Sequence, residues 1–496
     1  MSYKPDLSHL DRAGIASLTA QIADRIAADI DAGVLQPGDK LPTTRELAVQ
    51  ASVNHLTAAR IYRRLADQGY VAAQVGRGTF VRAHPPLEGG REDDEWQASV
   101  LRPRPSTYAE QMLAESLGTG RDVLPLATGF PADDLLPAEE IAALAPEVLA
   151  ACGSGLQYLP VEGLPELRVR LAELGAGAGW AQEADEILVT TGARQAIDLV
   201  ARAVLGPGDV VVVESPTFTG TLTSLQATGA HVLGLPLDED GADIGVLERL
   251  LARHEVKLVV LQPACQNPTG VDLSAARRER LAALARERGF FILEDGVYAE
   301  MALDGRERPR LRALAPAHVI YVDSLSKSVG GGLRLGWIAS SGAVGARLVR
   351  LKMDTDLHSA ALPQHLAAAW LAGDRHQEHL RRVVPEYRRR RDVLLAALDR
   401  HLGADATWQV PAGGQHLWVT LRRAVDERAL YGEALRAGVS FLPGGAAQAE
   451  PSSRTSLRLS FSYVAPDELE EGVRRLARAL AAVRRRAPVS ATAPMS

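Results

Sequence analysis

The sequence predicts an α/β protein with a small N-terminal domain of three helices and a hairpin, followed by a large domain with a mainly parallel sheet. Two observations predict this division. Apolar residues recur at helical spacings of three and four in the first part, whereas short apolar runs alternate with longer amphipathic stretches in the second. Between the two parts, residues 83–105 are rich in proline, glycine and mixed charge and follow neither period.

These changes of pattern predict four segments. Residues 1–82 form the small domain, and residues 83–105 form a flexible linker. Residues 106–486 form the large domain, and residues 487–496 form a disordered tail of small and polar side chains.

Composition limits the class of protein. The 496 residues are 46% apolar and 23% charged, which are ordinary globular values. The net charge is −6, so any surface that binds nucleic acid must be local. Two cysteines cannot build a disulfide framework, no apolar stretch is long enough to span a membrane, and the N-terminus lacks the pattern of a signal peptide. We therefore expect a soluble cytoplasmic protein that does not engage a membrane.

Three amphipathic helices are predicted in the small domain. The first carries one apolar stripe and ends at Gly33. The members of that stripe are Ile15, Leu18, Ile22, Ile26 and Ile30. Thr43 followed by Glu46 is a capping-box signature and begins a short second helix. The third helix runs from about Asn54 to Gln68.

A hairpin completes the small domain. Residues 70–82 alternate in polarity, and Gly76-Arg77-Gly78 is a glycine-bracketed hairpin tip. Three helices followed by a hairpin is the order of a winged helix-turn-helix. Residues 40–82 carry seven basic and two acidic side chains, so positive charge gathers on the elements that would face phosphates. The plain alternative is that the arginines of the third helix form only a solvated face.

This region resembles the GntR family of regulators in three pieces, PGDKLPTTREL, VNHLTAARIYRRLADQGY and GRGTFV. The resemblance implies binding to double-stranded DNA. The residues expected at the DNA are Arg45, His55, Thr57, Arg60, Gly76, Arg77 and Gly78. The family usually has arginine at the start of the recognition helix, where this chain has His55, so we expect a contact there that is lost or depends on pH.

Five near-continuous apolar runs predict buried parallel strands with helices on both faces of the sheet. The runs are EILVT (186–190), DVVVVE (209–214), KLVVLQ (257–262), FFILE (290–294) and HVIYVD (318–323). In such open sheets, ligands bind beyond the carboxyl ends of the strands. The residues that follow each run are therefore candidates for a binding site.

Each candidate has a plain explanation when it is taken alone. The Gly192-Ala193 turn opens a helix and suits a phosphate, but glycine is common at such turns for geometric reasons. Phe218 is more often a core residue, and Lys327 more often a surface lysine. All of the candidates, however, are expected at one edge of the sheet. They are Gly192, Ala193, Phe218, Asn267, Asp295, Tyr298, Ser324, Ser326, Lys327 and Arg334.

This combination of side chains suits pyridoxal 5'-phosphate (PLP). The cofactor needs a lysine for a Schiff base and a carboxylate that keeps the pyridine nitrogen protonated. It also needs donors to its ring oxygen and an anion cradle for its phosphate. The sequence offers all of these groups, and we expect no metal site.

The large domain resembles the aminotransferases of fold type I over about residues 106–485. The motifs are TGARQAIDL, ESPTF, NPTG, EDGVY, SLSKSVGGGLRLGW, AGGQHLWV and LRLSF. The resemblance implies a mainly parallel sheet flanked by helices, with a smaller α+β part at the C-terminal end. It also implies that Lys327 forms the Schiff base and moves the proton in transamination, and that Asp295 pairs with the pyridinium nitrogen.

The resemblance implies the remaining roles at the cofactor as well. Tyr298 and Asn267 would hydrogen-bond the ring oxygen, and Phe218 would stack on the ring. Arg458 would bind the substrate carboxylate beside Gly129. The phosphate would be held by Gly192, Ala193, Ser324, Ser326 and Arg334. In the other subunit of a homodimer formed through the large domain, the phosphate would be reached by Tyr158.

The two halves in this order resemble the MocR subfamily of GntR regulators. We expect a PLP-dependent DNA-binding regulator whose large domain senses PLP or a small amino compound through aldimine formation. The alternative is a working aminotransferase for an α-amino acid, with DNA binding secondary, and the sequence favours neither decisively. A DNA-binding scaffold that has abandoned the cofactor is disfavoured, because Lys327, Asp295 and Arg334 are retained together.

Overall fold

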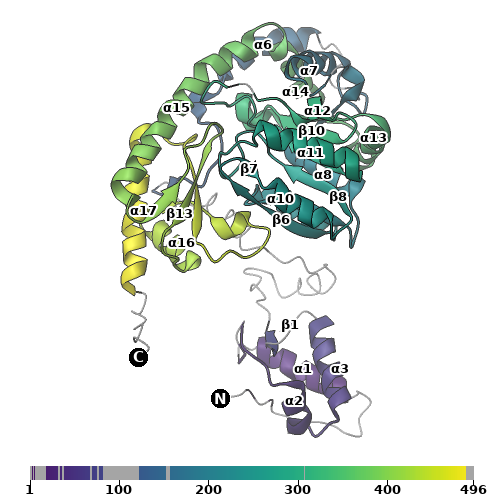
Figure 1. Ribbon diagram of the computed structural model, residues 1–496, viewed down its shortest axis with the longest axis vertical. Helices are drawn as coiled ribbons and strands as arrows, with labels where there is room; N and C mark the ends of the chain where they lie inside the picture. The colour runs from purple at the N-terminus through teal and green to yellow at the C-terminus, as the bar shows by residue number, and fades with distance from the viewer. Residues whose placement is uncertain are drawn as a thin grey trace. The chain divides into compact units, whose positions relative to one another are not determined.

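The computed structural model divides into two compact units, Met1–Pro105 and Ser106–Ser496, which are described separately (Figure 1). The predicted linker and the predicted C-terminal tail lie outside the described residues. The residues that the structure describes are 3, 5, 18–31, 34–35, 38–67, 70–74, 78–81, 122–151, 157–181, 183–306 and 308–486.

The N-terminal unit has the predicted three helices and hairpin. Its elements are α1 (Leu18–Asp31), α2 (Thr44–Gln50), α3 (His55–Asp67), β1 (Val71–Gln74) and β2 (Gly78–Val81). The two strands pair antiparallel. Apolar side chains from all three helices are fully buried against one another, because each helix presents one apolar stripe. They include Ile22, Ile26, Leu47, Ala58, Ile61 and Leu65.

The start of α2 is fixed by its own side chains. The predicted capping box is present: the Glu46 N–H donates to Thr43 Oγ1 at 3.2 Å, and the Thr43 N–H donates to Glu46 Oε2 at 2.7 Å. Two backbone donors that a helix start leaves free are thereby satisfied. The Tyr62 hydroxyl on α3 donates to the carbonyl of Pro42 at 2.5 Å and ties the two helices together.

The large unit is built on an eight-stranded sheet with the order β4-β11-β10-β9-β8-β5-β6-β7. The five predicted strands are present, and β5, β8, β9 and β10 pair parallel as expected. Three further strands, β6, β7 and β11, were not predicted, and β11 runs antiparallel to both of its neighbours. The strands are β4 (Ile187–Thr190), β5 (Val210–Ser215), β6 (His231–Asp238), β7 (Gly241–Ala242), β8 (Val256–Leu261), β9 (Phe291–Asp295), β10 (Val319–Ser324) and β11 (Gly336–Ala339).

Helices cover both faces of this sheet, as the buried runs predicted. The side chain of Val212 on β5 packs with α10 and α11, whereas Val211 and Val213 pack with α8 and α9 on the opposite face. Figure 1 shows α10 and α11 lying along the near face. The helices that flank the sheet are α8 (Ala193–Val204), α9 (Thr219–Ala227), α10 (Ile244–Leu251), α11 (Ala275–Arg288), α12 (Leu311–Leu314) and α13 (Gly342–Asp356).

The C-terminal part is the expected smaller α+β region. Its antiparallel sheet has the order β12-β13-β16-β15 and packs against α15, α16 and α17. Its elements are α15 (Arg375–Leu402), β12 (Ala406–Trp408), β13 (His416–Leu421), α16 (Glu427–Arg436), β15 (Leu442–Pro443), β16 (Ser456–Ser460) and α17 (Pro466–Arg486).

Shorter elements complete the large unit. A parallel pair joins β14 to β3, and α14 packs with α6 and α7. These elements are β3 (Leu124–Pro125), α6 (Ala138–Ala151), α7 (Pro165–Ala178), α14 (Ala361–Leu371) and β14 (Val439–Ser440). Among the described helices, none is both long and apolar enough to cross a membrane.

Candidate functional site

A cavity of about 680 Å³ lies at the carboxyl edge of the parallel strands, where the small sheet meets the large one. Twelve of the residues named from the sequence line it, and they come from turns that are far apart along the chain. They are Gly129, Gly192, Ala193, Phe218, Asn267, Asp295, Tyr298, Ser324, Ser326, Lys327, Arg334 and Arg458. Tyr158 does not line this cavity; it is 80% exposed, and its ring contacts His358 edge to face.

Lys327 lies in a single π-helical turn, Ser326–Gly330, directly after β10. Its Nζ donates to the carbonyl oxygen of Gly129 at 2.7 Å and lies 5.6 Å from the centre of the Phe130 ring. Burial and, to a smaller extent, the charge of Arg458 lower the pKa of Lys327 to about 8, although the charge of Asp295 opposes both effects. More of this amine is therefore unprotonated near neutral pH than of an ordinary lysine, and the unprotonated form is the one that attacks a carbonyl group.

Asp295 is the last residue of β9, and its carboxyl group is buried. Burial raises its pKa to about 6, whereas the N–H of Val297, which donates to Oδ1 at 3.3 Å, and the charge of Lys327 favour the ionised form. The group is thus mainly a carboxylate at neutral pH, and it lines the same cavity as the lysine.

An anion cradle forms where β4 turns into α8. Gly192 precedes α8 with φ +129°, and a Cβ on Gly336 would lie 2.7 Å from its Cα, so the two backbones pass in contact. Ser324 Oγ lies 2.8 Å from Ser326 Oγ, and Arg334 lines the same part of the cavity with a left-handed φ of +49°. Hydroxyls, an arginine and the start of a 12-residue helix together form a cradle suited to a phosphate.

Arg458 projects from β16 and is 6% exposed. Its Nη2 donates to the carbonyl of Ala127 at 2.6 Å, and its Nη1 donates to Asn267 Oδ1 at 3.3 Å. Its Nε is buried and has no partner among the described residues. Burial lowers the pKa of Arg458 to about 10, so the guanidinium stays charged at neutral pH and can take up an anion.

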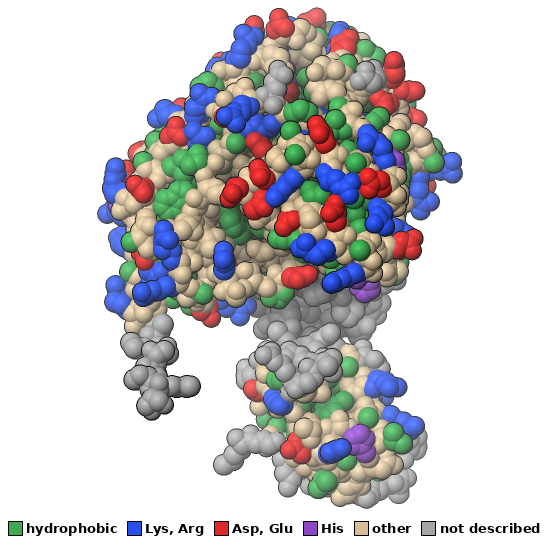
Figure 2. Space-filling view, viewed as in Figure 1, with side chains coloured by type: hydrophobic (Ala, Val, Ile, Leu, Met, Phe, Trp, Pro, Cys, Tyr) green, Lys and Arg blue, Asp and Glu red, His purple; other side chains and the backbone are tan. Residues whose placement is uncertain are grey.

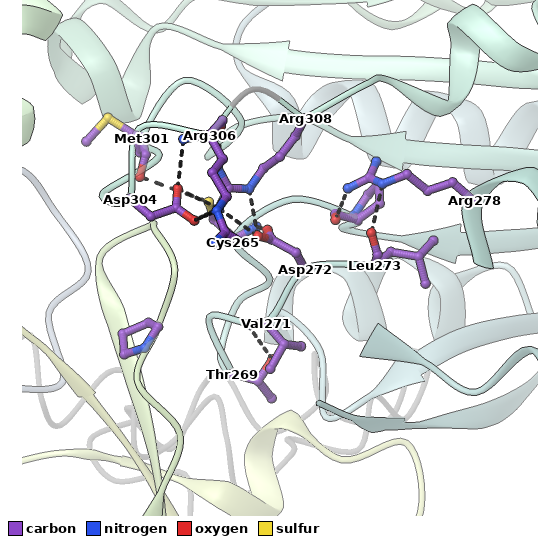
Figure 3. A network of polar contacts seen from close by, with 12 residues as sticks. Cys265, Thr269, Val271, Asp272, Leu273, Arg278, Met301, Asp304, Arg306 and Arg308 are labelled. Carbon is purple, nitrogen blue, oxygen red and sulfur yellow. Dashed lines mark hydrogen bonds and ion pairs between the residues drawn. The ribbon is translucent and has the colours of Figure 1, made fainter. Parts of the chain in front are cut away.

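A polar network braces the loop that carries Asn267 (Figure 3). The carboxylate of Asp272 accepts from the N–H of Cys265 at 2.8 Å and from Arg308 Nε at 2.7 Å. Arg308 also pairs with Asp304 at 3.0 Å. The arginine is almost fully buried, so these contacts hold the loop at the edge of the cavity through two carboxylates.

Several residues that line the cavity were not named from the sequence. They include Phe130, Asp133, Arg194, Gln262, His416 and Tyr463. His416 belongs to the AGGQHLWV motif, and its Nε2 lies 2.9 Å from the Tyr298 hydroxyl. A histidine in a buried strand was the available signal, but its place beside Tyr298 depends on how the two sheets pack.

In the N-terminal unit, most of the residues expected at the DNA are exposed. Arg45, His55 and Arg60 are exposed, and Thr57 is half-buried, with its N–H donating to Asn54 Oδ1 at 2.7 Å at the start of α3. Figure 2 shows basic side chains along the side of this unit where α3 lies. Gly78, at the start of β2, has a φ of +120°, whereas Gly76 and Arg77 lie outside the described residues.

The cavity residues fit PLP in their chemistry. An amine of lowered pKa, a buried carboxylate and a phosphate cradle line one space, and the Nε of Arg458 is a buried donor without an acceptor in the part of the chain that the structure describes. A cavity of this size is large enough for the cofactor. Among the residues that the structure describes, no cluster of side chains could hold a metal ion.

Comparison with known proteins agrees with this class of site. The model of aminotransferase class I and II matches residues 121–476, and that of the bacterial regulatory proteins of the gntR family matches residues 18–81. The aromatic-amino-acid aminotransferase 1 of Thermococcus litoralis is 33% identical over 72% of this chain and 87% of its own. The HTH-type transcriptional regulator TauR of Rhodobacter capsulatus is 31% identical over 94% of this chain and 97% of its own.

A solved structure extends the comparison to the fold. LysN, an alpha-aminoadipate aminotransferase from Thermus thermophilus, complexed with N-(5'-phosphopyridoxyl)-L-leucine, is 34% identical and superimposes with a TM-score of 0.71. The match covers 75% of this chain and 95% of that one.

Fold and site together define a GntR-type DNA-binding domain joined to a fold type I PLP domain, and the cofactor of the large domain is PLP. The chain belongs to the aminotransferase class I and II family, in the two-domain architecture of the MocR regulators.

Proposed function

We propose that this protein is a transcriptional regulator whose large domain binds PLP and a small amino compound and thereby changes how the N-terminal domain binds DNA. One observation carries the proposal: a GntR-type module precedes, in the same chain, a cavity that Lys327, Asp295 and Arg458 line together. A cytoplasmic location, where the DNA lies, follows from the same proposal.

The residue roles follow from the cavity. PLP, when bound, supplies a conjugated ring that draws electrons from the carbon next to the amino group. Lys327 would hold the cofactor covalently, and Asp295 would pair with the ring nitrogen. Phe218 would stack on the ring, and Asn267 and Tyr298 would hydrogen-bond the ring oxygen. The phosphate would be held by Gly192, Ala193, Ser324, Ser326 and Arg334, all of which line the cavity.

Arg458 selects the amino compound. A carboxylate beside Gly129 would accept from the guanidinium and satisfy its buried Nε, which has no partner in the described part of the chain. An amino acid is therefore a better ligand than an amine without a carboxylate.

A homodimer completes the site. The resemblance to fold type I aminotransferases assigns Tyr158 to the phosphate of the partner subunit, and its 80% exposure in one chain leaves its side chain open to such a contact. One pair of large domains would then hold two DNA-binding domains. If the pair has two arrangements, a ligand that binds one of them more tightly favours that arrangement and thereby changes the affinity for DNA.

At the DNA, α3 enters the major groove with its N-terminal end. His55 and Thr57 then lie near base edges, Arg45 and Arg60 near phosphates, and the hairpin of β1 and β2 near the flanking backbone.

The second candidate function is turnover as an aminotransferase. The cavity supports it because Lys327, whose pKa is lowered to about 8, serves equally well as a base that moves a proton. The relatives include both aminotransferases and regulators.

One experiment separates the two functions. The PLP-loaded protein is titrated with a panel of amino acids and amines in the presence of 2-oxoglutarate, and both the visible absorption and the keto acid formed are measured. A regulator gives a lasting spectral change with one compound and less than about one equivalent of keto acid. Release of keto acid over many cycles would make the protein an enzyme first. Lys327→Ala is the control, and borohydride-trappable PLP in that variant would contradict the assignment of the lysine.

A further inference from the structure

A buried histidine of the small sheet, His416, lies against Tyr298 in the cavity. His416 begins β13, and its side chain is 3% exposed. Its Nε2 is 2.9 Å from the Tyr298 hydroxyl oxygen, and the two rings meet edge to face with their centres 5.6 Å apart. This is the only hydrogen bond that the hydroxyl makes within the described parts of the chain.

The backbone around His416 leaves room for this ring and little else. A Cβ on Gly129 would lie 2.4 Å from Cε1 of His416, far inside van der Waals contact. The carbonyl of the same glycine accepts from Lys327 at 2.7 Å. The imidazole is thereby held between the lysine contact on one side and Tyr298 on the other.

The imidazole is neutral. Burial lowers the pKa of His416 well below its usual value, and the positive charges of Arg458 and Lys327 lower it further. His416 pairs with Ser460 of β16, and Arg458 lies two residues before Ser460 on the same strand. The side chains of His416 and Arg458 therefore lie on the same face of the small sheet. The remaining titratable group against the ring is Tyr298, and burial raises the pKa of its hydroxyl, which stays protonated.

A neutral imidazole has one N–H donor and one acceptor nitrogen, and its Nδ1 has no partner among the described residues. If Nδ1 carries the hydrogen, a donor is buried without an acceptor, and the Tyr298 hydroxyl must donate to Nε2. If Nε2 carries it, the unpartnered atom is an acceptor near two cations, and the Tyr298 hydrogen is free to donate elsewhere. Either arrangement leaves one buried donor without an acceptor among the described residues, but only in the second is that donor, the Tyr298 hydroxyl, satisfied by the ring oxygen of bound PLP. The positive charges of Arg458 and Lys327 also favour a lone pair over a hydrogen on Nδ1, so the second arrangement is favoured.

We propose that His416 is a positioning residue, which donates from Nε2 to Tyr298 and so directs the hydroxyl hydrogen of Tyr298 at the ring oxygen of the cofactor. This inference rests on the proposed function, since that oxygen is present only with PLP bound. A donor to the ring oxygen favours the state with more negative charge, in which the lysine nitrogen has lost its proton. His416 therefore lowers the apparent pKa of that proton.

The test is a pH titration of the visible absorption of the PLP-loaded protein. His416→Phe keeps a ring beside Gly129 but cannot donate, whereas His416→Gln restores an amide donor. We expect His416→Phe to raise the apparent pKa by about one pH unit, which corresponds to one ordinary hydrogen bond, and His416→Gln to recover most of that shift. In a Tyr298→Phe background, His416→Phe should cause no further shift in the apparent pKa.

An unchanged midpoint in a folded His416→Phe variant, or a full further shift in the Tyr298→Phe background, would overturn the inference. If His416→Phe does not fold, nitrogen-15 NMR of histidine-labelled protein without cofactor decides, with His416→Gln identifying the signal. A protonated Nε2 is expected, and a protonated Nδ1 would overturn the assignment. A wild-type protein that shows no cofactor band at all would contradict the proposed function instead, and the NMR result would still judge His416.

Discussion

Replacing Arg458 by glutamine tests how the large domain selects its ligand. The substitution removes a buried positive charge whose Nη1 and Nη2 are anchored to Asn267 and Ala127 and whose Nε has no partner in the described part of the chain. A carboxylate in the cavity would complete this set of contacts. An amine without a carboxylate gains nothing from the same group.

The size of the effect follows from the burial of the guanidinium. Arg458 is 6% exposed, so solvent barely weakens its interaction with an anion. A hydrogen bond to a charged group contributes about 1.5–3 kcal/mol. We therefore expect Arg458→Gln to weaken binding of the amino acid by about 10- to 150-fold and to leave binding of the matching decarboxylated amine nearly unchanged.

The assay is a spectral titration of PLP-loaded protein with the most responsive amino acid and its decarboxylated counterpart. Arg454→Gln is a matched control, because Arg454 is exposed in the same segment of the chain. An equal loss of affinity for both compounds would refute the assignment of Arg458 to the carboxylate. A comparable loss in Arg454→Gln would trace the effect to surface charge.

Three further outcomes are expected. Gly129→Ala should destabilise the large domain to chemical denaturation by about 1–3 kcal/mol, because the new Cβ would lie 2.4 Å from His416; an unchanged midpoint would contradict the tight contact. The rate at which cofactor-free protein binds PLP covalently should rise with pH through about 8, as the buried Lys327 loses its proton; a midpoint near 10.5, the ordinary value for lysine, would contradict that environment. Arg45→Ala should weaken DNA binding and reduce its salt dependence by about one ion; an unchanged slope would mean that Arg45 does not touch phosphate.

The sequence predicted the strands that appear as near-continuous apolar runs, and it missed β6 and β11 for different physical reasons. Strand β5 begins with four consecutive valines because helices cover both its faces. Strand β6 lies near the sheet edge, is largely half-buried or exposed, and contains Gly234 and Pro236, so it lacks that signal. Strand β11 has four residues directly after a glycine-rich loop, too few to show a period.

The sequence predicted those site residues whose convergence follows from the order of the strands in the large sheet. Asp295 and Ser324 end neighbouring parallel strands, so their convergence follows from strand order. His416 comes from the small antiparallel sheet, and its contact with Tyr298 depends on how two sheets pack, which no local pattern encodes. The role assigned to Tyr158 needs a second subunit and stays a prediction.

The most direct test of the central claim is the affinity for DNA measured in different ligand states. Operator fragments are first selected from random DNA with the purified protein, and fluorescence anisotropy then gives the affinity without PLP, with PLP, and with PLP and each amino compound of the panel, at one fixed salt concentration. We predict that one compound changes the affinity at least about fivefold in the wild type and not in Lys327→Ala. Equal affinity in every state, with keto acid accumulating over many cycles, would contradict the account and make the large domain an enzyme that merely shares a chain with a DNA-binding module.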